Sequence, residues 1–191
     1  MKHIVLDDAV PEEVMRQLYS DAKTFKWLYN RSTYAENTNH IMNHQVYDVG
    51  QLVHGIITKD DKNVEYFEKW LQPIVDAVQP HIKPIRKIDR AKFNLLWRTP
   101  DSKGRWNMPH LDTHDTTNRR ENKWSLVYYV NQADGDTIFF YPNETVRVEA
   151  KRGRIVLFPA NLKHAGTNPV DAFERIVVNI VVETEYDMSN L

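Results

Sequence analysis

Short runs of apolar or alternating residues, separated by turn residues, dominate the chain from about residue 86 onward. Strands of about four to eight residues bounded by turn residues are the usual signal of β-sandwiches and barrels. Asp134-Gly135 and Arg152-Gly153 supply two of the turns. We therefore expect a β core whose strands lie near residues 89–97, 107–112, 124–131, 136–141, 145–149, 154–158, 162–166 and 174–184.

The first 85 residues have a different texture, which predicts helices joined by irregular segments. Pro11 followed by two acidic residues is typical of a helix start, because the positive end of the helix dipole favours negative charge. A second helix is expected over residues 61–78, where apolar side chains recur every three or four positions. Pro73 lies inside this pattern and predicts a kink or a break. Residues 30–58 are polar and have no clear period.

Composition limits the domain organisation and the classes of function. No stretch of the 191 residues reads as a linker, and 41% of them are hydrophobic, enough for one core. We expect a single domain, residues 1–191, of the α+β class and mainly β. In it, helical and irregular support (residues 1–85) packs on a β core (residues 86–191).

Charge and cysteine content exclude further classes. The net charge is −1, from 25 basic and 26 acidic residues, and this balance argues against a nucleic-acid partner. The chain has no cysteine, which rules out disulfides, iron–sulfur clusters and thiol nucleophiles. Because neither a signal peptide nor a long apolar span is visible, we expect a cytoplasmic protein without a membrane partner.

His110-Leu111-Asp112 is the first candidate for chemistry. In a strand, residues i and i+2 point to the same face, so one imidazole and one carboxylate would converge. They would supply two of the three ligands of the facial triad that binds non-haem Fe(II) and leaves positions open. Such a tripeptide also arises by chance in a chain with 8 histidines. The alternative is a surface histidine beside an acid.

Two later residues strengthen the first candidate by their spacing. His164 lies just after an apolar run, and Arg175 begins the last apolar run 11 residues further on. A hairpin-like return could place Arg175 beside His164, where a buried guanidinium needs an anion and a carboxylate would form a bidentate pair. The alternative is an exposed arginine at a strand start.

In this order and spacing, the four residues resemble the Fe(II)/2-oxoglutarate-dependent dioxygenases, most of all their prolyl-4-hydroxylase-like branch with small phage and bacterial members. The resemblance extends over roughly residues 86–184. It also includes the stretches Arg90–Leu95, Ser125–Asn131, Asp134–Thr137 and Arg154–Pro159. It implies a double-stranded β-helix, a jelly-roll of eight strands. The chain departs from many relatives by having Asp-Gly instead of Gly-Gly in the turn, and from collagen-type enzymes by having Arg instead of Lys.

The resemblance also implies roles for individual residues. His110, Asp112 and His164 would hold Fe(II). Arg175 would pair with the distal carboxylate of 2-oxoglutarate. The co-substrate pocket would also include Tyr129, Thr137, Asn94 and Asn179. The oxidant would be O2, and no catalytic side chain is expected beyond the metal ligands.

The implied activity is hydroxylation of an unactivated C–H bond in a protein side chain or a small molecule, with release of succinate and CO2. The alternative is a jelly-roll module that binds metal or 2-oxoglutarate as a sensor, without turnover. A nucleic-acid demethylase of the same superfamily is a third alternative. The pattern typical of those enzymes has a second arginine six residues after the first, and this chain has valine at position 181, which argues against this alternative. His114 is a competing ligand, and residues 34–57 are a candidate lid. The residues leave the substrate and the oligomeric state open.

Overall fold

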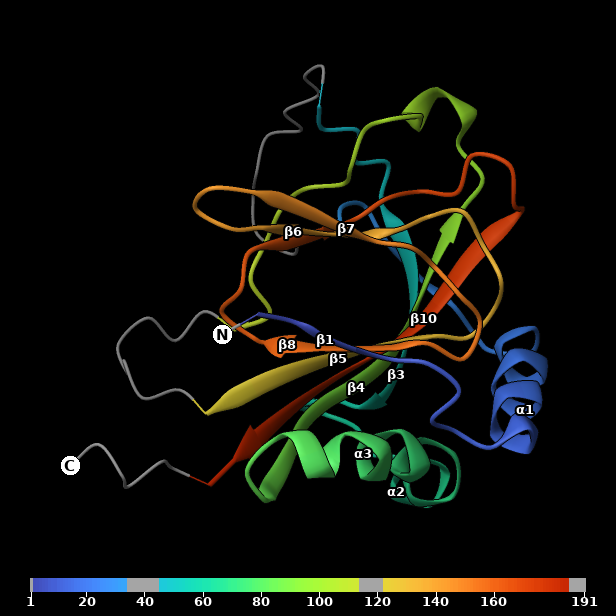
Figure 1. Ribbon diagram of the computed structural model, residues 1–191. Helices are drawn as coiled ribbons and strands as arrows, with labels where there is room; N and C mark the ends of the chain where they lie inside the picture. Colours follow the sequence, from blue (N-terminus) through green and yellow to red (C-terminus); the bar gives the residue numbers. More distant parts are fainter. Residues whose placement is uncertain (1, 34–44, 114–121, 186–191) are drawn as a thin grey trace.

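Two antiparallel sheets form the core of the protein in the computed structural model, which describes residues 2–33, 45–113 and 122–185 (Figure 1). The larger sheet has seven strands in the order β1-β8-β5-β10-β4-β3-β2, and the smaller has three in the order β7-β6-β9. The larger sheet consists of β1 (Ile4–Leu6), β2 (Leu28–Asn30), β3 (Gln51–Ile57), β4 (Ile85–Trp97), β5 (Lys123–Tyr129), β8 (Ile155–Pro159) and β10 (Glu174–Thr184). The smaller sheet consists of β6 (Thr137–Phe140), β7 (Thr145–Val148) and β9 (His164–Gly166). The architecture is the mainly β jelly-roll that the sequence predicts.

Seven of the eight expected strands are present, and the one expected over residues 107–112 is wrong. That segment instead runs beside β9 and makes a single bridge, between His110 and His164. Pro109 interrupts a continuous ladder because it has no N–H to donate. The strands β1, β2 and β3 were not expected, so the first 85 residues contribute to the larger sheet as well as supporting it.

The helices begin and end close to the expected positions. Helix α1 (Glu12–Ala22) buries the apolar face that its spacing predicts. The expected helix over residues 61–78 consists of α2 (Val64–Tyr66), a π-helical turn (Phe67–Leu71) and α3 (Gln72–Val78). Pro73, the second residue of α3, cannot donate to the preceding turn, and the irregular turn lies directly before it. Short 3-10 turns follow at Gln79–His81 and Pro100–Ser102. None of the helices in the described part of the chain has the length and apolar composition that a bilayer crossing needs.

The central strands β4 and β10 present two different faces. They pair antiparallel, with Arg175 opposite Leu96 and Asn179 opposite Lys92. Successive side chains of a strand alternate between its two faces. We call the face toward the helices the outer face and the face toward the smaller sheet the inner face. The outer face packs with α1 and α3 in one apolar cluster. Figure 1 shows α2 and α3 on one side of the larger sheet and the smaller sheet on the other, so the inner face lies between the sheets.

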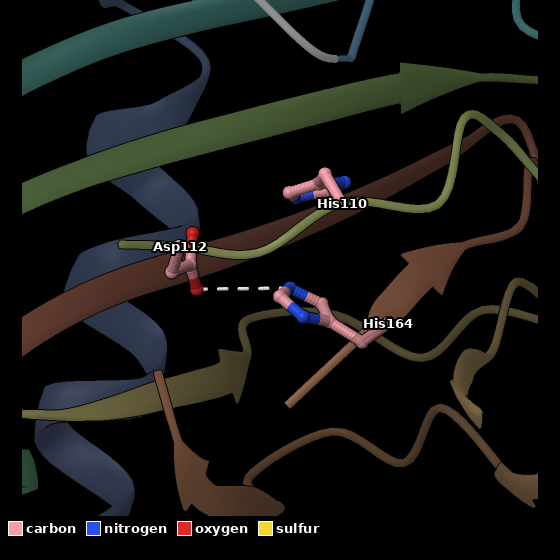
Figure 2. Close-up of side chains that lie close together, drawn as sticks. All are labelled: His110, Asp112 and His164. Carbon is pink, nitrogen blue, oxygen red and sulfur yellow. Dashed lines mark ion pairs between the residues drawn. The ribbon is translucent and has the colours of Figure 1, made fainter. Parts of the chain in front are cut away.

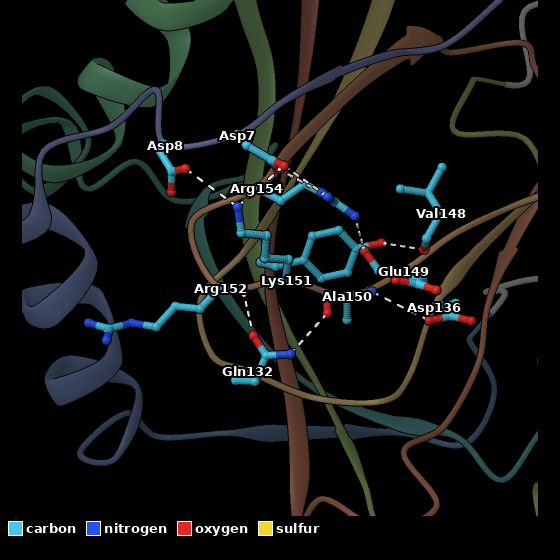
Figure 3. A network of polar contacts seen from close by, with 11 residues as sticks. Asp7, Asp8, Gln132, Asp136, Val148, Glu149, Ala150, Lys151, Arg152 and Arg154 are labelled. Atoms are coloured by element: carbon cyan, nitrogen blue, oxygen red, sulfur yellow. Dashed lines mark hydrogen bonds and ion pairs between the residues drawn. The ribbon is translucent and has the colours of Figure 1, made fainter.

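A group of charged residues joins the segment directly after β1 to the turn directly before β8 (Figure 3). Arg154 donates two hydrogen bonds to the carboxylate of Asp7, from Nε to Oδ1 at 2.7 Å and from Nη2 to Oδ2 at 2.9 Å. The ammonium of Lys151 lies 3.3 Å from Asp7 and 3.4 Å from Asp8. The hydrogen bonds from Arg154 lower the pKa of Asp7 to about 2. Here the chain supplies its own counter-charge to a surface arginine.

Candidate active site

His110, Asp112 and His164 converge at the inner face, from segments that lie far apart in the chain (Figure 2). The N–H of His110 donates to the carbonyl of His164 at 2.8 Å, and the N–H of His164 donates back at 3.0 Å. This exchange of two backbone hydrogen bonds aligns the two residues, and their ring centroids lie 4.5 Å apart. One potential ligand atom from each of the three residues lies within 4.8 Å of the others. The geometry is that of a three-ligand metal site.

Backbone carbonyls set the tautomer of both histidines. Nδ1 of His110 lies 3.0 Å from the carbonyl of Met108, and Nδ1 of His164 lies 2.9 Å from that of Leu162. A carbonyl can only accept, so each Nδ1 carries the proton and each Nε2 keeps its lone pair. Burial, together with the neighbouring His164, lowers the pKa of His110 to about 4, which keeps this ring neutral near pH 7. Both rings are therefore prepared to bind a metal through Nε2.

Arg90 and Asn179 hold the carboxylate of Asp112. Nη2 of Arg90 donates to Oδ1 at 2.6 Å, and Nδ2 of Asn179 donates to Oδ2 at 3.2 Å. The same Arg90 nitrogen also donates to Oδ1 of Asn179 at 2.9 Å. Burial is the largest single influence and by itself would raise the pKa of Asp112, but the positive charge of Arg90 and the neighbouring His164 and His110 together hold the pKa far below its usual range. Asp112 is therefore ionised, and its Oδ2 lies 3.6 Å from Nε2 of His164.

Arg175 is a buried cation whose hydrogen bonds are incomplete. Its side chain is held by two donations, from Nε to the carbonyl of Gly135 at 2.7 Å and from Nη2 to Oγ1 of Thr137 at 3.0 Å. The residue is only 5% exposed, and no carboxylate of the described residues forms an ion pair with it. A buried guanidinium without an anion is costly, and its remaining N–H groups suit a carboxylate.

Tyr129 and Gly135 keep Arg175 in place. The guanidinium lies over the Tyr129 ring, 5.2 Å from its centroid, and the Tyr129 hydroxyl lies 2.6 Å from Oγ1 of Thr137. A Cβ atom at Gly135 would come within 2.7 Å of the Arg175 side chain and 2.6 Å of the Thr167 carbonyl. Only glycine fits at this turn, which is a physical reason for the second residue of Asp134-Gly135.

A single cavity joins the metal-ligand triad to Arg175. It is also lined by Thr137, Asn94 and Asn179, whereas Tyr129 lies behind Thr137 and does not line it. Asn179 bonds to Asp112, so it reaches the metal site more directly than the sequence indicates. The Asn94 side chain makes no hydrogen bond to any described residue, and its buried Oδ1 has no partner there.

Two alternatives from the sequence concern residues that the structure describes in part or not at all. His114 lies outside the described residues. The candidate lid, residues 34–57, is described only from residue 45, and that part includes β3 of the larger sheet.

Three residues at this site have no role in the interpretation of the sequence. Arg90 and Lys92 lie in the stretch Arg90–Leu95 that carries part of the resemblance, and Asn107 lies outside it. Arg90 and Lys92 could have been found from Asn94, because positions two apart on a strand share a face. Asn107, which lines the cavity, donates from Nδ2 to Asn168 and leaves its own buried Oδ1 without a partner among the described residues.

Comparison with known proteins places this geometry in context. Residues 96–182 match the sequence model of the 2OG-Fe(II) oxygenase superfamily. No curated protein sequence matches the chain. Similar solved structures include a Pseudomonas putida prolyl-4-hydroxylase, with 17% identity over 96% of this chain and 92% of that one and a TM-score of 0.61. A Trichoplax adhaerens prolyl hydroxylase, in complex with a hypoxia inducible factor peptide fragment, has 13% identity over 95% and 83% and a TM-score of 0.61. HygX from Streptomyces hygroscopicus, with nickel and 2-oxoglutarate bound, has 10% identity over 95% and 82% and a TM-score of 0.59.

Proposed function

The chain is a member of the 2OG-Fe(II) oxygenase superfamily through residues 96–182, and from this premise we propose that it hydroxylates an unactivated C–H bond. Enzymes of this class use Fe(II), 2-oxoglutarate and O2. In the proposed reaction, one oxygen atom of O2 enters the substrate as a hydroxyl group and the other enters succinate, while 2-oxoglutarate loses CO2. The observation that carries the proposal is the His110, Asp112 and His164 triad in one cavity with Arg175.

The donor set fits Fe(II). Two imidazole nitrogens and one carboxylate oxygen on one face are the ligands of non-haem Fe(II) oxygenases. Each Nδ1 donates to a backbone carbonyl, so Nε2 of both histidines is the nitrogen whose lone pair can bind the metal. When bound, the metal would supply the activation of O2 with electrons from 2-oxoglutarate.

The residues around Asp112 position its carboxylate. Arg90 donates to Oδ1 and Asn179 donates more weakly to Oδ2, and we assign Oδ2 as the metal ligand because it faces His164. Asn179 is bonded to both Asp112 and Arg90 and fixes the plane of the carboxylate. One oxygen from Asp112 keeps the remaining positions of the metal open for the co-substrate and O2.

Arg175 would receive the distal carboxylate of 2-oxoglutarate. Gly135 and Thr137 already accept hydrogen bonds from its side chain. Tyr129 supports this arrangement, because its hydroxyl contacts Thr137 and its ring lies against the guanidinium. The amide of Asn94 offers a further hydrogen bond on the cavity wall. Val127 and Val177 line the same cavity, and their apolar side chains would limit water around the bound co-substrate.

The finer features of the enzyme belong to the same proposal. We take residues 1–191 as one domain with a cytoplasmic location, and the substrate as a small molecule or a peptide. One structural neighbour is in complex with a peptide fragment and another is an epimerase from nogalamycin biosynthesis, so the fold alone does not choose between a peptide and a small molecule. The second candidate function is a sensor that binds 2-oxoglutarate without turnover, which the same triad and Arg175 would permit.

Succinate formation separates the enzyme from the sensor. Native protein with Fe(II), 2-oxoglutarate and O2 should release succinate slowly on its own and faster with the correct substrate. His164→Ala should release none, because it removes a metal ligand. Binding of 2-oxoglutarate by native protein without succinate above the His164→Ala background would contradict the enzyme and favour the sensor.

A further inference from the structure

Lys92 is a charged residue at the active site that the proposed reaction does not use. It lies on the inner face of β4, opposite Asn179 of β10. Its ammonium makes no hydrogen bond and no ion pair with any residue that the structure describes, although the side chain is partly buried. Burial lowers the pKa of Lys92 to about 8. A cation held in this way has an unused capacity for an anion.

The position of Lys92 is between two cavities. It lines the cavity that contains the triad and Arg175, and it also lines a larger neighbouring cavity of about 430 Å³. Asp112 is the other charged residue shared by both. This larger cavity, which we call the outer cavity, therefore opens directly beside a proposed metal ligand. Its volume is within the range of small-molecule sites.

The register of β4 and β10 separates Lys92 from the co-substrate cation. Arg175 is opposite Leu96, whereas Lys92 is opposite Asn179, four residues further along β10. At about 3.3 Å per residue, the backbone positions are roughly 13 Å apart. The outer cavity continues in the same direction, away from Arg175, to Val181 and Arg90, which face each other. Arg175 and Lys92 thus serve opposite ends of the site.

Among the cations that line the outer cavity, Lys92 is the partly buried one without a carboxylate partner among the described residues, whereas Lys59 is exposed. Asp89 is already paired with Lys87 at 2.7 Å and with Lys123 at 2.9 Å. Arg90 is paired with Asp112. Apolar wall is provided by Leu28, Val53 and Val181. The cavity therefore offers one inner positive charge beside an apolar surface.

We propose that the outer cavity is the site of the primary substrate, and that Lys92 binds a carboxylate or phosphate group of a small molecule with an apolar segment. This inference rests on the proposed function, because it takes the triad as the reacting centre. Contact between the anionic group and Lys92 would place the apolar segment beside Asp112, where the metal is proposed. Lys92 would then select the substrate and set its orientation.

The test uses zinc-loaded protein saturated with 2-oxoglutarate, so that no turnover occurs and the Arg175 end is filled. Isothermal titration would measure the binding of isovalerate, isopentyl phosphate and the neutral isovaleramide. Native protein should bind at least one anion about tenfold more tightly than the amide. The preference for isovalerate or for the phosphate identifies the anionic group. Lys92→Met and Lys92→Gln should lose the preference and Lys92→Arg should keep it. Lys103→Met, an exposed lysine outside the cavity, is the matched control.

Two results would overturn the inference. One is that native protein and the two neutral variants do not differ for any probe, including the case in which nothing binds. The other is that Lys92→Met weakens 2-oxoglutarate binding as much as Arg175→Met does, because Lys92 would then serve the co-substrate. Thermal melting checks that each variant is folded, and the neutral variants should melt no lower than native protein. Succinate release by native protein is measured separately, so a failure of the proposed function is recognised independently.

Discussion

The two faces of strands β4 and β10 share one backbone but differ in their side chains: the outer face is apolar and the inner face carries charged and polar groups. On the outer face, Phe93, Val178 and Ile180 are fully buried in an apolar cluster with the helices. On the inner face, the same strands place Arg90 and Lys92 from β4, and Arg175 and Asn179 from β10, around two cavities. Successive residues of these strands therefore alternate between the apolar core, which stabilises the fold, and the candidate site.

The two faces contribute to the free energy of folding with opposite sign. Apolar burial on the outer face favours folding by roughly 25 cal/mol per Å². The inner face contains charges whose burial opposes folding unless they are paired. Arg154, at the surface, has Asp7 as its carboxylate partner, whereas Arg175 has none among the described residues. A bound anionic ligand would pair with the Arg175 guanidinium and offset the cost of burying it.

The largest expected effect is on the outer face. Phe93→Ala removes a fully buried ring and should lower the free energy of unfolding by about 3–5 kcal/mol. Denaturant unfolding measures the loss. Metal affinity of the folded fraction should remain close to native, because the side chain points away from the triad. A large loss of metal affinity with little loss of stability would break the separation of the faces.

A smaller effect is expected on the inner face. Asn179→Ala removes one hydrogen bond to Asp112 and one from Arg90, and should weaken metal binding by about 10- to 100-fold. Unfolding stability should change much less than in Phe93→Ala. Titration with Co(II), followed by its visible absorption, measures the affinity. Val178→Ala, the neighbour on the outer face, is the matched control and should bind Co(II) like native protein.

The smallest effect concerns the pair of Asp7 and Arg154. The pKa of Asp7 is lowered to about 2, so its contribution to stability is present above about pH 4 and is lost as pH falls towards 2. Because both side chains are partly exposed, we expect about 1 kcal/mol or less. Unfolding of native protein and Asp7→Asn across this range measures it. The difference between them should shrink as pH falls, and a difference that stays constant would contradict the ion pair.

Much of this arrangement could be predicted from the sequence because its signals are local. Apolar periodicity marks α1 and seven strands, and the spacing of His110, Asp112, His164 and Arg175 marks the site. The sequence does not predict strand β3, because Gly55 and the bulge after it interrupt the alternation of apolar and polar residues. Lys92 was missed for another reason. In the sequence, a lysine in an alternating strand is typical of a solvent-facing position. The inner face of β4 is covered only because the smaller sheet packs over it in the folded protein.

The most direct test of the account is an anaerobic titration with Fe(II) and then 2-oxoglutarate, followed by visible absorption. Native protein should develop the charge-transfer band of a metal-chelated keto acid. His164→Ala should lose the band, and Arg175→Met should need about 10- to 100-fold more 2-oxoglutarate, as expected for a lost charge-assisted bidentate pair. Absence of the band in folded, iron-loaded native protein, or an unchanged titration in Arg175→Met, would contradict the assignment of the inner face as the site.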